Sequence, residues 1–165
     1  REFLPFRAAI AAGVATIMTA HVFIPALDEK LPATLSTRVV TGLLREELGF
    51  QGVIISDDLE MKALANDYEV PDSTVRAIEA GCDAVLICSG NHDVQAAALE
   101  ALVRRVESDR AFEKRVGDAL TRNRRAKERF LGAAVSAAPL SSTALRRVLG
   151  HDAHRRTADE MARFA

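Results

Sequence analysis

Hydrophobic and polar positions divide the chain into short apolar runs and longer stretches with helical spacing. Three runs combine aliphatic and β-branched residues, which favour extended backbone, and are predicted to be strands at residues 14–18, 52–56 and 83–88. In the middle run, three β-branched residues stand in a row without a polar interruption. Uninterrupted runs of this kind are typical of parallel strands that are buried on both faces.

Helical patterns separate these runs. A first helix is predicted over residues 3–12, and a second follows Ser36, whose side chain suits the N-cap position. A third is predicted to be capped by Asp72 or Ser73 and to run through residue 80. Each of the three is followed by a glycine, the residue that most readily ends a helix: Gly13, Gly49 and Gly81.

Strands that alternate with helices in this way predict an α/β fold with a parallel sheet. The alternation stops after Cys88, where two longer helices are predicted, the second over residues 112–131. Small residues at 133–139 predict a linker, and two short helices are predicted behind it, at 141–149 and 152–164.

Composition and charge argue against several classes of partner. The chain has 165 residues and a net charge of −1, so no overall field favours nucleic acid or an anionic membrane surface. Residues 28–83 hold 12 acidic against 5 basic side chains, and residues 104–129 hold 10 basic against 5 acidic. Regular aromatic interleaving is absent from the basic segment, which favours a solvated helix surface over an RNA-binding one. No apolar run approaches the roughly 20 residues that a membrane-spanning helix needs.

The two cysteines and four histidines show no metal-binding or redox spacing. Cys82 and Cys88 flank the third predicted strand, which would hold them roughly 20 Å apart, whereas a disulfide needs Cα atoms within about 7 Å. Both are therefore predicted to be free, buried thiols, which favours a reducing compartment, and a cytoplasmic location is expected. The histidines are scattered and no CxxC motif occurs, so neither a metal ion nor another cofactor is expected.

The first candidate for chemistry is the Ser56-Asp57-Asp58 motif, at the end of the second predicted strand. In parallel sheets and barrels, the carboxyl ends of the strands carry the active site. A carboxylate at Asp57 can serve there as a nucleophile, a general base or a metal ligand. It can equally cap the next helix without a catalytic role, and the motif alone does not decide between these hypotheses.

The second candidate, His21, follows the first predicted strand and is expected at the same edge of the sheet as Asp57. It can line a pocket as a donor, act as an acid or base, or be a loop histidine with its hydrogen bonds satisfied. His92 follows the third strand and is predicted to cap a helix or face solvent, whereas His151 and His154 are predicted to be surface residues. No GxGxxG or GxxxxGK sequence is present, so a glycine-rich phosphate loop is not expected.

Five segments, in order, carry a family resemblance: LPFRAAI, VATIMTAHV, ALD…LPATLS, LLREELGFQGVIISDDLEM and AIEAGCDAVLIC. Over residues 3–131 the chain resembles glycoside hydrolase family 3, and most of all its bacterial β-N-acetylhexosaminidase branch. The resemblance implies removal of terminal β-N-acetylglucosamine in peptidoglycan recycling, with an N-acetylglucosamine-containing saccharide or muropeptide as the partner. One departure is Glu60, where the family usually has a small residue at the pocket rim.

The resemblance also implies roles for single residues. Asp57 matches the nucleophile that forms a covalent glycosyl-enzyme in retaining hydrolysis. Met18 and His21 match residues near the sugar pocket. The family's general acid/base histidine, in a Gly-His-Gly region that follows a Lys-His pair, has no counterpart in this sequence. The Asp and Arg that hold the sugar in the family have none either.

The family fold is a TIM (β/α)8-like barrel, yet only three strand patterns are present here, where a complete barrel has eight. Residues 1–132 are therefore expected to form about the last three β/α units, the C-terminal portion of the barrel. Residues 133–165 are expected to form a linker and helices that lead toward a second domain. Alone, such a piece is expected to be inactive, because its main partner is the N-terminal half of its own barrel.

Two other hypotheses stay open. The parent protein can be a family 3 β-glucosidase or phosphorylase, with the same nucleophile and a different sugar or acceptor. Alternatively, the chain is a non-catalytic half-barrel that binds a partner. In either case open sheet edges and apolar interior faces have to be covered, so the isolated chain is expected to self-associate.

Overall fold

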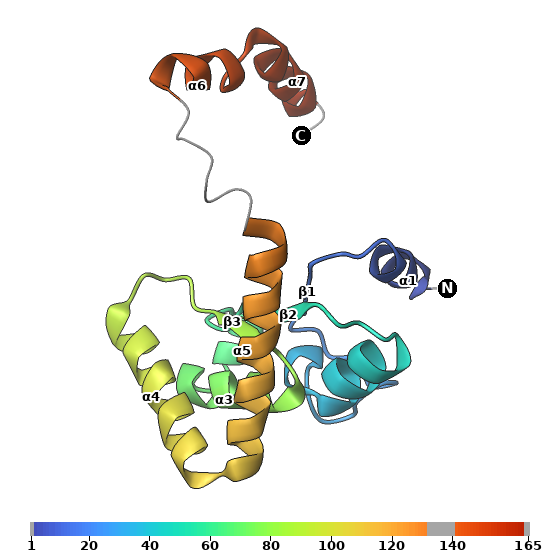
Figure 1. Ribbon diagram of the computed structural model, residues 1–165, viewed down its shortest axis with the longest axis vertical. Coiled ribbons are helices and arrows are strands. Elements are labelled where there is room, and N and C mark those ends of the chain that lie inside the picture. The colour runs from blue at the N-terminus through green and yellow to red at the C-terminus, as the bar shows by residue number, and fades with distance from the viewer. Residues whose placement is uncertain (1, 132–140, 164–165) are drawn as a thin grey trace. The chain divides into compact units, whose positions relative to one another are not determined.

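The structure is a computed structural model that describes residues 2–131 and 141–163. The chain divides into two compact units, Arg1–Phe130 and Leu131–Ala165. The first unit contains a three-stranded parallel sheet in the order β1-β2-β3. Its strands are β1 (Thr16–Met18), β2 (Val53–Asp58) and β3 (Ala84–Leu86), as Figure 1 shows. The predicted α/β fold with a parallel sheet is confirmed.

The strand boundaries differ from the prediction by up to two residues. β1 starts at Thr16, two residues later than predicted. β2 runs on to Asp58, so both aspartates of the SDD motif lie within the strand. β3 ends early, at Leu86. The pairing of β2 with β3 is irregular just before this point, and an interrupted ladder lets the backbone leave the sheet.

Helical segments connect and cover the strands. Before and between the strands lie α1 (Leu4–Ala11), η1 (Ala33–Leu35), η2 (Arg38–Glu47), α2 (Lys62–Ala65) and α3 (Val70–Ala80), and after the sheet lie α4 (His92–Ser108) and α5 (Arg110–Leu131). The predicted glycine stops are confirmed, since Gly13, Gly49 and Gly81 all have positive φ. Gly81 is the most constrained of them, because a Cβ there would stand 2.5 Å from Thr41 Oγ1.

The helix after Ser36 was expected to be a regular α-helix, and its winding is different. Its hydrogen bonds are of the π type, such as the bond from Leu48 N to the Leu43 carbonyl (2.9 Å). The N-cap position is Thr37, whose side chain forms no capping bond, but Ser36, one residue earlier, accepts a hydrogen bond from Val39 N at its Oγ (3.3 Å).

The start of α3 corrects a second prediction. The helix begins at Val70, so Asp72 and Ser73 lie inside its first turn and do not occupy the N-cap position. Pro71 explains the earlier start, because the fixed φ of proline suits the first turn of a helix.

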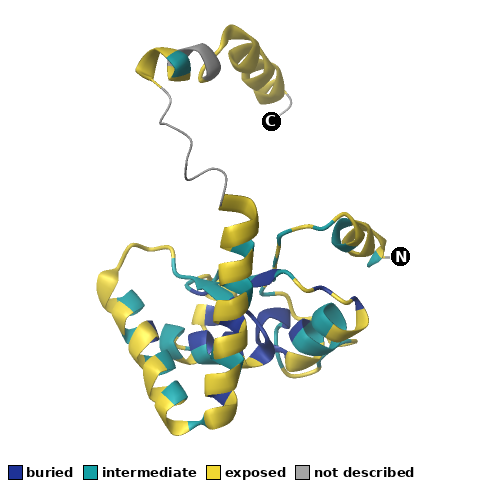
Figure 2. Ribbon diagram, in the orientation of Figure 1, coloured by how far each residue is buried: buried dark blue, intermediate teal, exposed yellow. Residues whose placement is uncertain are grey.

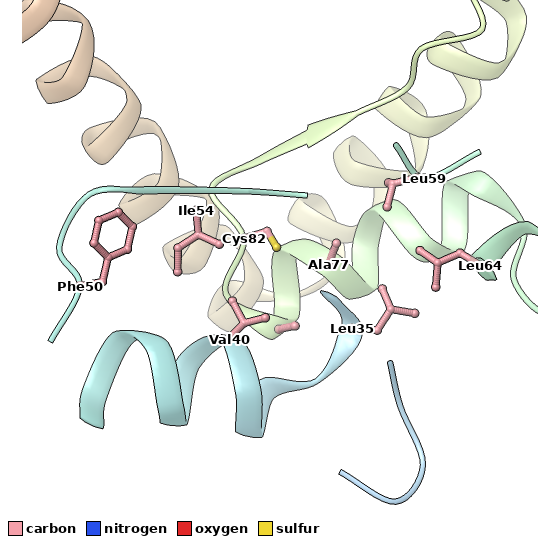
Figure 3. Packing of buried hydrophobic residues seen from close by; sticks show 9 residues of the cluster. Leu35, Val40, Phe50, Ile54, Leu59, Leu64, Ala77 and Cys82 are labelled. Carbon is pink, nitrogen blue, oxygen red and sulfur yellow. The ribbon is translucent and has the colours of Figure 1, made fainter. Parts of the chain in front are cut away.

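Helices cover one side of the sheet, and apolar residues beside β1 remain exposed. The core joins β2 to η1, η2, α2 and α3, and Figure 3 shows its packing. Its members are Leu35, Val40, Phe50, Ile54, Leu59, Leu64, Ala77, Ala80 and Cys82. In β1 and the loop after it, by contrast, Met18 and Phe23 are each 53% exposed. Figure 2 shows the buried segments near the middle of the first unit, whereas α4 and α5 are exposed over most of their length. Exposed apolar positions of this kind are expected of part of a barrel.

The amino end of the sheet is closed by a buried carboxylate and arginines. Asp83, directly before β3, has a side chain with 0% exposure. It accepts hydrogen bonds from Arg45 of η2 and from Ile54 N (3.0 Å). Arg115 of α5 donates to its other oxygen (2.7 Å), and Arg122 lies 3.4 Å from that same oxygen. These contacts tie α5 to the starts of β2 and β3.

The second unit contains α6 (Ser142–Val148) and α7 (Asp152–Ala162), so both predicted C-terminal helices are confirmed. His151 and His154 are exposed, as predicted. The linker predicted at 133–139 lies outside the described residues. Among the helices described, none combines the length and the apolar composition that crossing a membrane requires.

Candidate active site

The carboxyl end of β2 leaves the regular ladder at the SDD motif. β2 and β3 are in register at Ile55 and again at Asp58, and three steps along β2 match two along β3. In this interval Leu86 N donates a hydrogen bond to Ser56 Oγ (3.0 Å). Such a bulge re-aims side chains and is frequent beside active sites. Asp57 lies inside the bulge and is partly exposed.

Asp57 is the less restrained carboxylate of the motif. Its Oδ1 accepts a hydrogen bond from Asp58 N (2.8 Å). Within the described part of the chain this is the only hydrogen bond to its side chain, and Oδ2 accepts none. The hypothesis that Asp57 caps the next helix is wrong, because the N-cap of α2 is Met61 and no side chain bonds there.

Asp58, the neighbour of Asp57, is held by the backbone around it. Its Oδ1 accepts hydrogen bonds from Glu60 N (3.2 Å) and from Cys88 N (3.2 Å). Its carbonyl accepts a hydrogen bond from His21 Nε2 (2.9 Å). Asp58 thereby joins the loop after β1, the end of β2 and the loop after β3, whereas Asp57 accepts only the bond from the amide beside it.

Both ring nitrogens of His21 are engaged. Nε2 donates to the carbonyl of Asp58, an atom that can only accept, so this nitrogen carries a proton. Nδ1 lies 2.8 Å from Thr34 Oγ1, which in turn lies 2.9 Å from Thr19 Oγ1. Thr34 is fully buried, whereas Thr19 and His21 at the two ends of this row are half-buried. The structure therefore places His21 at the backbone beside Asp57, with its hydrogen bonds satisfied.

Sequence reasoning did not single out the two threonines of this row. Thr19 lies two residues before His21, in MTAH, and this closeness was the one available signal. Thr34 lies in the LPATLS segment, where nothing in the pattern distinguishes it from a solvent-facing threonine.

Met18 lines a cavity that neither Asp57 nor His21 lines. The cavity has a volume of about 330 Å³ and lies between α1, β1 and η2. Its other walls are mainly apolar, from residues such as Phe6 and Leu44. Asp57, at the end of β2, is partly exposed and does not line this cavity.

A comparison with protein families shows where this arrangement belongs. The family model described as the glycosyl hydrolase family 3 N-terminal domain matches residues 1–126. The chain belongs to glycoside hydrolase family 3. The resemblance stated from the five sequence segments is confirmed.

Relatives of this family 3 chain are β-hexosaminidases. One from Thioalkalivibrio sulfidiphilus is 46% identical over 102 residues, which are 61% of this chain and 28% of that protein. One from Nitrosomonas eutropha is 44% identical over 89 residues, 54% of this chain and 25% of that protein. The chain thus spans only 25% to 28% of the length of these two curated relatives.

Solved structures agree with this result. A family 3 β-N-acetylglucosaminidase from Paenibacillus sp. matches with a TM-score of 0.79 and 48% identity, over 86% of this chain and 27% of that one. A β-N-acetylhexosaminidase from Beutenbergia cavernae matches with a TM-score of 0.69 and 35% identity, over 74% of this chain and 36% of that one. The prediction of a partial TIM-barrel-like fold is confirmed.

Glu60 ties the loop after β3 to the rim in this family 3 chain. Its Oε2 accepts a hydrogen bond from Ser89 N (2.7 Å), and hydrogen bonding to Ser89 lowers the pKa of the Glu60 carboxyl.

Both cysteines are free, as predicted, but only Cys82 is buried. The prediction of a buried Cys88 is wrong, because β3 ends at Leu86 and the thiol lies in the exposed loop beyond it.

The remaining rim histidine faces solvent. His92 is exposed at the first position of α4, and the capping side chain is that of Asn91, which accepts a hydrogen bond from Asp93 N (3.0 Å). Of the two roles predicted for His92, the structure therefore supports solvent exposure.

Nowhere in residues 2–131 or 141–163 do three or more His, Cys, Asp or Glu side chains form a group that could hold a metal ion.

Proposed function

We propose that this chain is the C-terminal part of the catalytic barrel of a retaining β-N-acetylhexosaminidase, with Asp57 as its nucleophile. The observation that carries the proposal is the contrast within the SDD motif. Within the described residues Asp57 accepts a single side-chain hydrogen bond, from the amide of its own neighbour, whereas Asp58 Oδ1 is bound by two backbone amides from the loops after β2 and β3. Relatives named β-hexosaminidase and β-N-acetylglucosaminidase support the substrate class, a saccharide or muropeptide with terminal β-N-acetylglucosamine.

The proposed reaction has two displacement steps at the anomeric carbon. The Asp57 carboxylate attacks this carbon and forms an ester, while the glycosidic C–O bond breaks and a general acid gives its proton to the leaving oxygen. Water, deprotonated by the same group acting as a base, then attacks the anomeric carbon. The sugar leaves with its configuration retained, and the carboxylate of Asp57 is restored.

The general acid/base in this proposal comes from a part of the parent protein outside this chain. His21 uses both ring nitrogens in hydrogen bonds, and Glu60 binds Ser89. Asp58 is occupied by the backbone. None of these side chains is poised to exchange a proton with a leaving group, so we expect the chain alone to be inactive.

The same proposal assigns a place in the parent protein to each of the two parts of the chain. Residues 1–132 form the C-terminal portion of the barrel, and residues 133–165 form a linker and helices that lead toward a second domain. The exposed apolar residues Met18 and Phe23 are positions that the N-terminal half of the barrel would cover. Met18 and His21 lie near the sugar pocket of the complete barrel, and cytoplasmic peptidoglycan recycling is the proposed setting.

The test uses the full-length protein that contains this chain, with an aryl N-acetyl-β-glucosaminide as substrate. Asp57→Asn is expected to lower kcat by at least about 1,000-fold, because an amide cannot form the ester intermediate. Asp67→Asn is the matched control, since it removes an exposed carboxylate after α2 and should leave kcat unchanged. Wild-type kcat in Asp57→Asn excludes the nucleophile assignment.

The same assay separates the alternatives within the family. A hydrolase releases free N-acetylglucosamine whether or not inorganic phosphate is added. A phosphorylase releases the sugar 1-phosphate when phosphate is present, and a β-glucosidase prefers the aryl β-glucoside as substrate. Each of these outcomes keeps Asp57 as the nucleophile and changes only the acceptor or the sugar.

A further inference from the structure

A second cavity lies at the opposite end of the sheet from Asp57. Its volume is about 360 Å³, and its walls are the turns before β1 and β2 and the C-terminal half of α5. Gly52, immediately before β2, lines it, and Asp57 does not. Because β2 spans six residues, the cavity and Asp57 are separated by roughly 20 Å along the strand.

Three arginines of α5 line this cavity: Arg122, Arg125 and Arg129. Their spacing along the helix places them on one face. No acidic side chain is part of the lining. Arg125 and Arg129 form no ion pair with any residue in the described part of the chain, whereas Arg122 lies 3.4 Å from Asp83 Oδ1.

Asp83 cannot neutralise this group of arginines. Its carboxylate is already shared by Arg45 and by Arg115. Within the described residues, Arg115 Nη1 is buried and has no hydrogen-bond partner. One carboxylate therefore serves three guanidinium groups, and Arg125 and Arg129, which are both exposed, form no ion pair with a described residue. The amino end of the sheet has an excess of positive charge that an anionic ligand would balance.

Arg129 contacts the ring of Phe130 and faces Gly13 across the cavity. Its guanidinium carbon lies 4.9 Å from the centroid of the Phe130 ring, a cation–π contact. Gly13, on the facing turn, has φ +77°, and a Cβ there would stand 3.5 Å from Arg129 Nη2. A side chain at position 13 would narrow the cavity at this arginine, and glycine leaves it open.

We propose that this cavity binds a small phosphorylated molecule through Arg122, Arg125 and Arg129. Guanidinium groups bind phosphate oxygens through paired hydrogen bonds, and a phosphate group carries more charge than a carboxylate. The cavity has the volume of a small-molecule site at the lower end of the usual range. Apolar walls from Ile10 and Val14 suit an uncharged body attached to the phosphate. This site uses arginines and does not need the glycine-rich loop that the sequence lacks.

Inorganic pyrophosphate is the probe, titrated calorimetrically into the full-length protein that contains this chain, at low and at high ionic strength. We expect one saturable site per chain, with weaker binding at high salt. The double variant Arg125→Gln/Arg129→Gln is expected to lower the affinity at least about tenfold, because two charge-assisted contacts are lost. Arg124→Gln is the matched control, since Arg124 is exposed on the same helix and does not line the cavity. A thermal melt of each variant checks that it is folded.

Four outcomes would overturn the proposal. Absence of saturable binding removes the site, and equal affinity for sulfate means an adventitious ion only. Tighter binding of citrate than of pyrophosphate assigns a carboxylate ligand instead. An equal loss of affinity in Arg124→Gln means that the charge of α5 acts without a defined site. None of these results depends on Asp57, so the site and the glycosidase proposal stand or fall separately.

Discussion

Each end of the small parallel sheet carries an aspartate, and the two carboxylates differ in burial and in the number of hydrogen bonds that they accept. Asp83, at the amino end, is fully buried and binds Arg45, Arg115 and a backbone amide. Asp57, at the carboxyl end, is partly exposed and accepts one hydrogen bond, from the next residue in the chain. A carboxylate whose oxygens are all engaged holds structure, whereas one with an open oxygen is available to a substrate. The comparison agrees with the general division of barrel folds into a stabilising and a catalytic end.

The largest effect is expected when the charge of each aspartate is removed in turn, which tests this division between the two ends of the sheet. Asp83→Asn is expected to lower the free energy of unfolding by about 3–5 kcal/mol, because the surrounding arginines lose their buried partner. Asp57→Asn is expected to change it by less than about 0.5 kcal/mol. Urea denaturation followed by circular dichroism measures both, with Asp118→Asn on the exposed side of α5 as the control. Equal losses at Asp83 and Asp57 would remove the distinction between the two ends.

A smaller effect on stability is expected from replacing His21, which connects the loop after β1 to the carboxyl end of β2. His21→Ala removes the side-chain partner of the Asp58 carbonyl and one of the two partners of the buried Thr34 hydroxyl, which costs about 1–3 kcal/mol of stability. If His21 positions the backbone beside Asp57, kcat of the full-length protein falls while KM is unchanged.

The matched variant Thr34→Val removes the hydroxyl in the middle of the same row of contacts and should lower kcat, as His21→Ala does. A rise in KM with normal kcat in His21→Ala would instead show that the imidazole contacts the substrate directly.

The pH dependence of stability is expected to report on Asp28, in the loop after β1. Hydrogen bonds from the Ser36 hydroxyl and then from the Lys30 amide lower the pKa of Asp28 below its ordinary 3.8. The contribution of a group with a lowered pKa is fully present above the ordinary value and is lost as the pH falls through the lowered one. Asp28→Asn should therefore melt below the wild type at pH 6, and the difference should shrink below pH 3.8. A constant difference over this range would contradict the assignment.

The smallest perturbation is chemical labelling of the two thiols. Burial raises the pKa of Cys82 to about 12. Cys88 is exposed beyond β3. An aromatic disulfide reagent is expected to modify one thiol in the folded chain and the second only after unfolding. Cys88→Ser should abolish the labelling of the folded chain. Rapid labelling of Cys82 in that variant would show that the core around it opens.

Local pattern was sufficient for much of the fold. Runs of β-branched residues located the strands, and glycines located three helix ends, because both depend on the preferences of single residues. The early start of α3 was missed, because Pro71 in the first turn was a stronger signal than the capping side chains. The end of β3 was missed because it depends on pairing with a strand that lies about 30 residues earlier in the sequence.

The candidate site was located by sequence but not resolved by it. Asp57 and Asp58 are adjacent residues of the same type, so the sequence does not distinguish them. In the structure, the bulge and the amides of Glu60 and Cys88, which bind Asp58 and not Asp57, distinguish the two carboxylates. The partners of His21 lie 13 and 37 residues away, so no local spacing reveals them. The contacts between Asp83 and its arginines were not predicted for the same reason. Arg45 lies in η2, Arg115 lies in α5 and Asp83 directly precedes β3, so no local spacing connects them.

The most direct test of the central claim, that Asp57 is the nucleophile, is trapping of the covalent intermediate. The full-length protein is treated with a fluorinated, activated N-acetylglucosamine-type inactivator, digested, and analysed by mass spectrometry. The account predicts a mass increase of one sugar on the peptide that contains Asp57, with no labelling in the Asp57→Asn variant. A sugar attached to any other residue, or an active enzyme that is never labelled at Asp57, would contradict it.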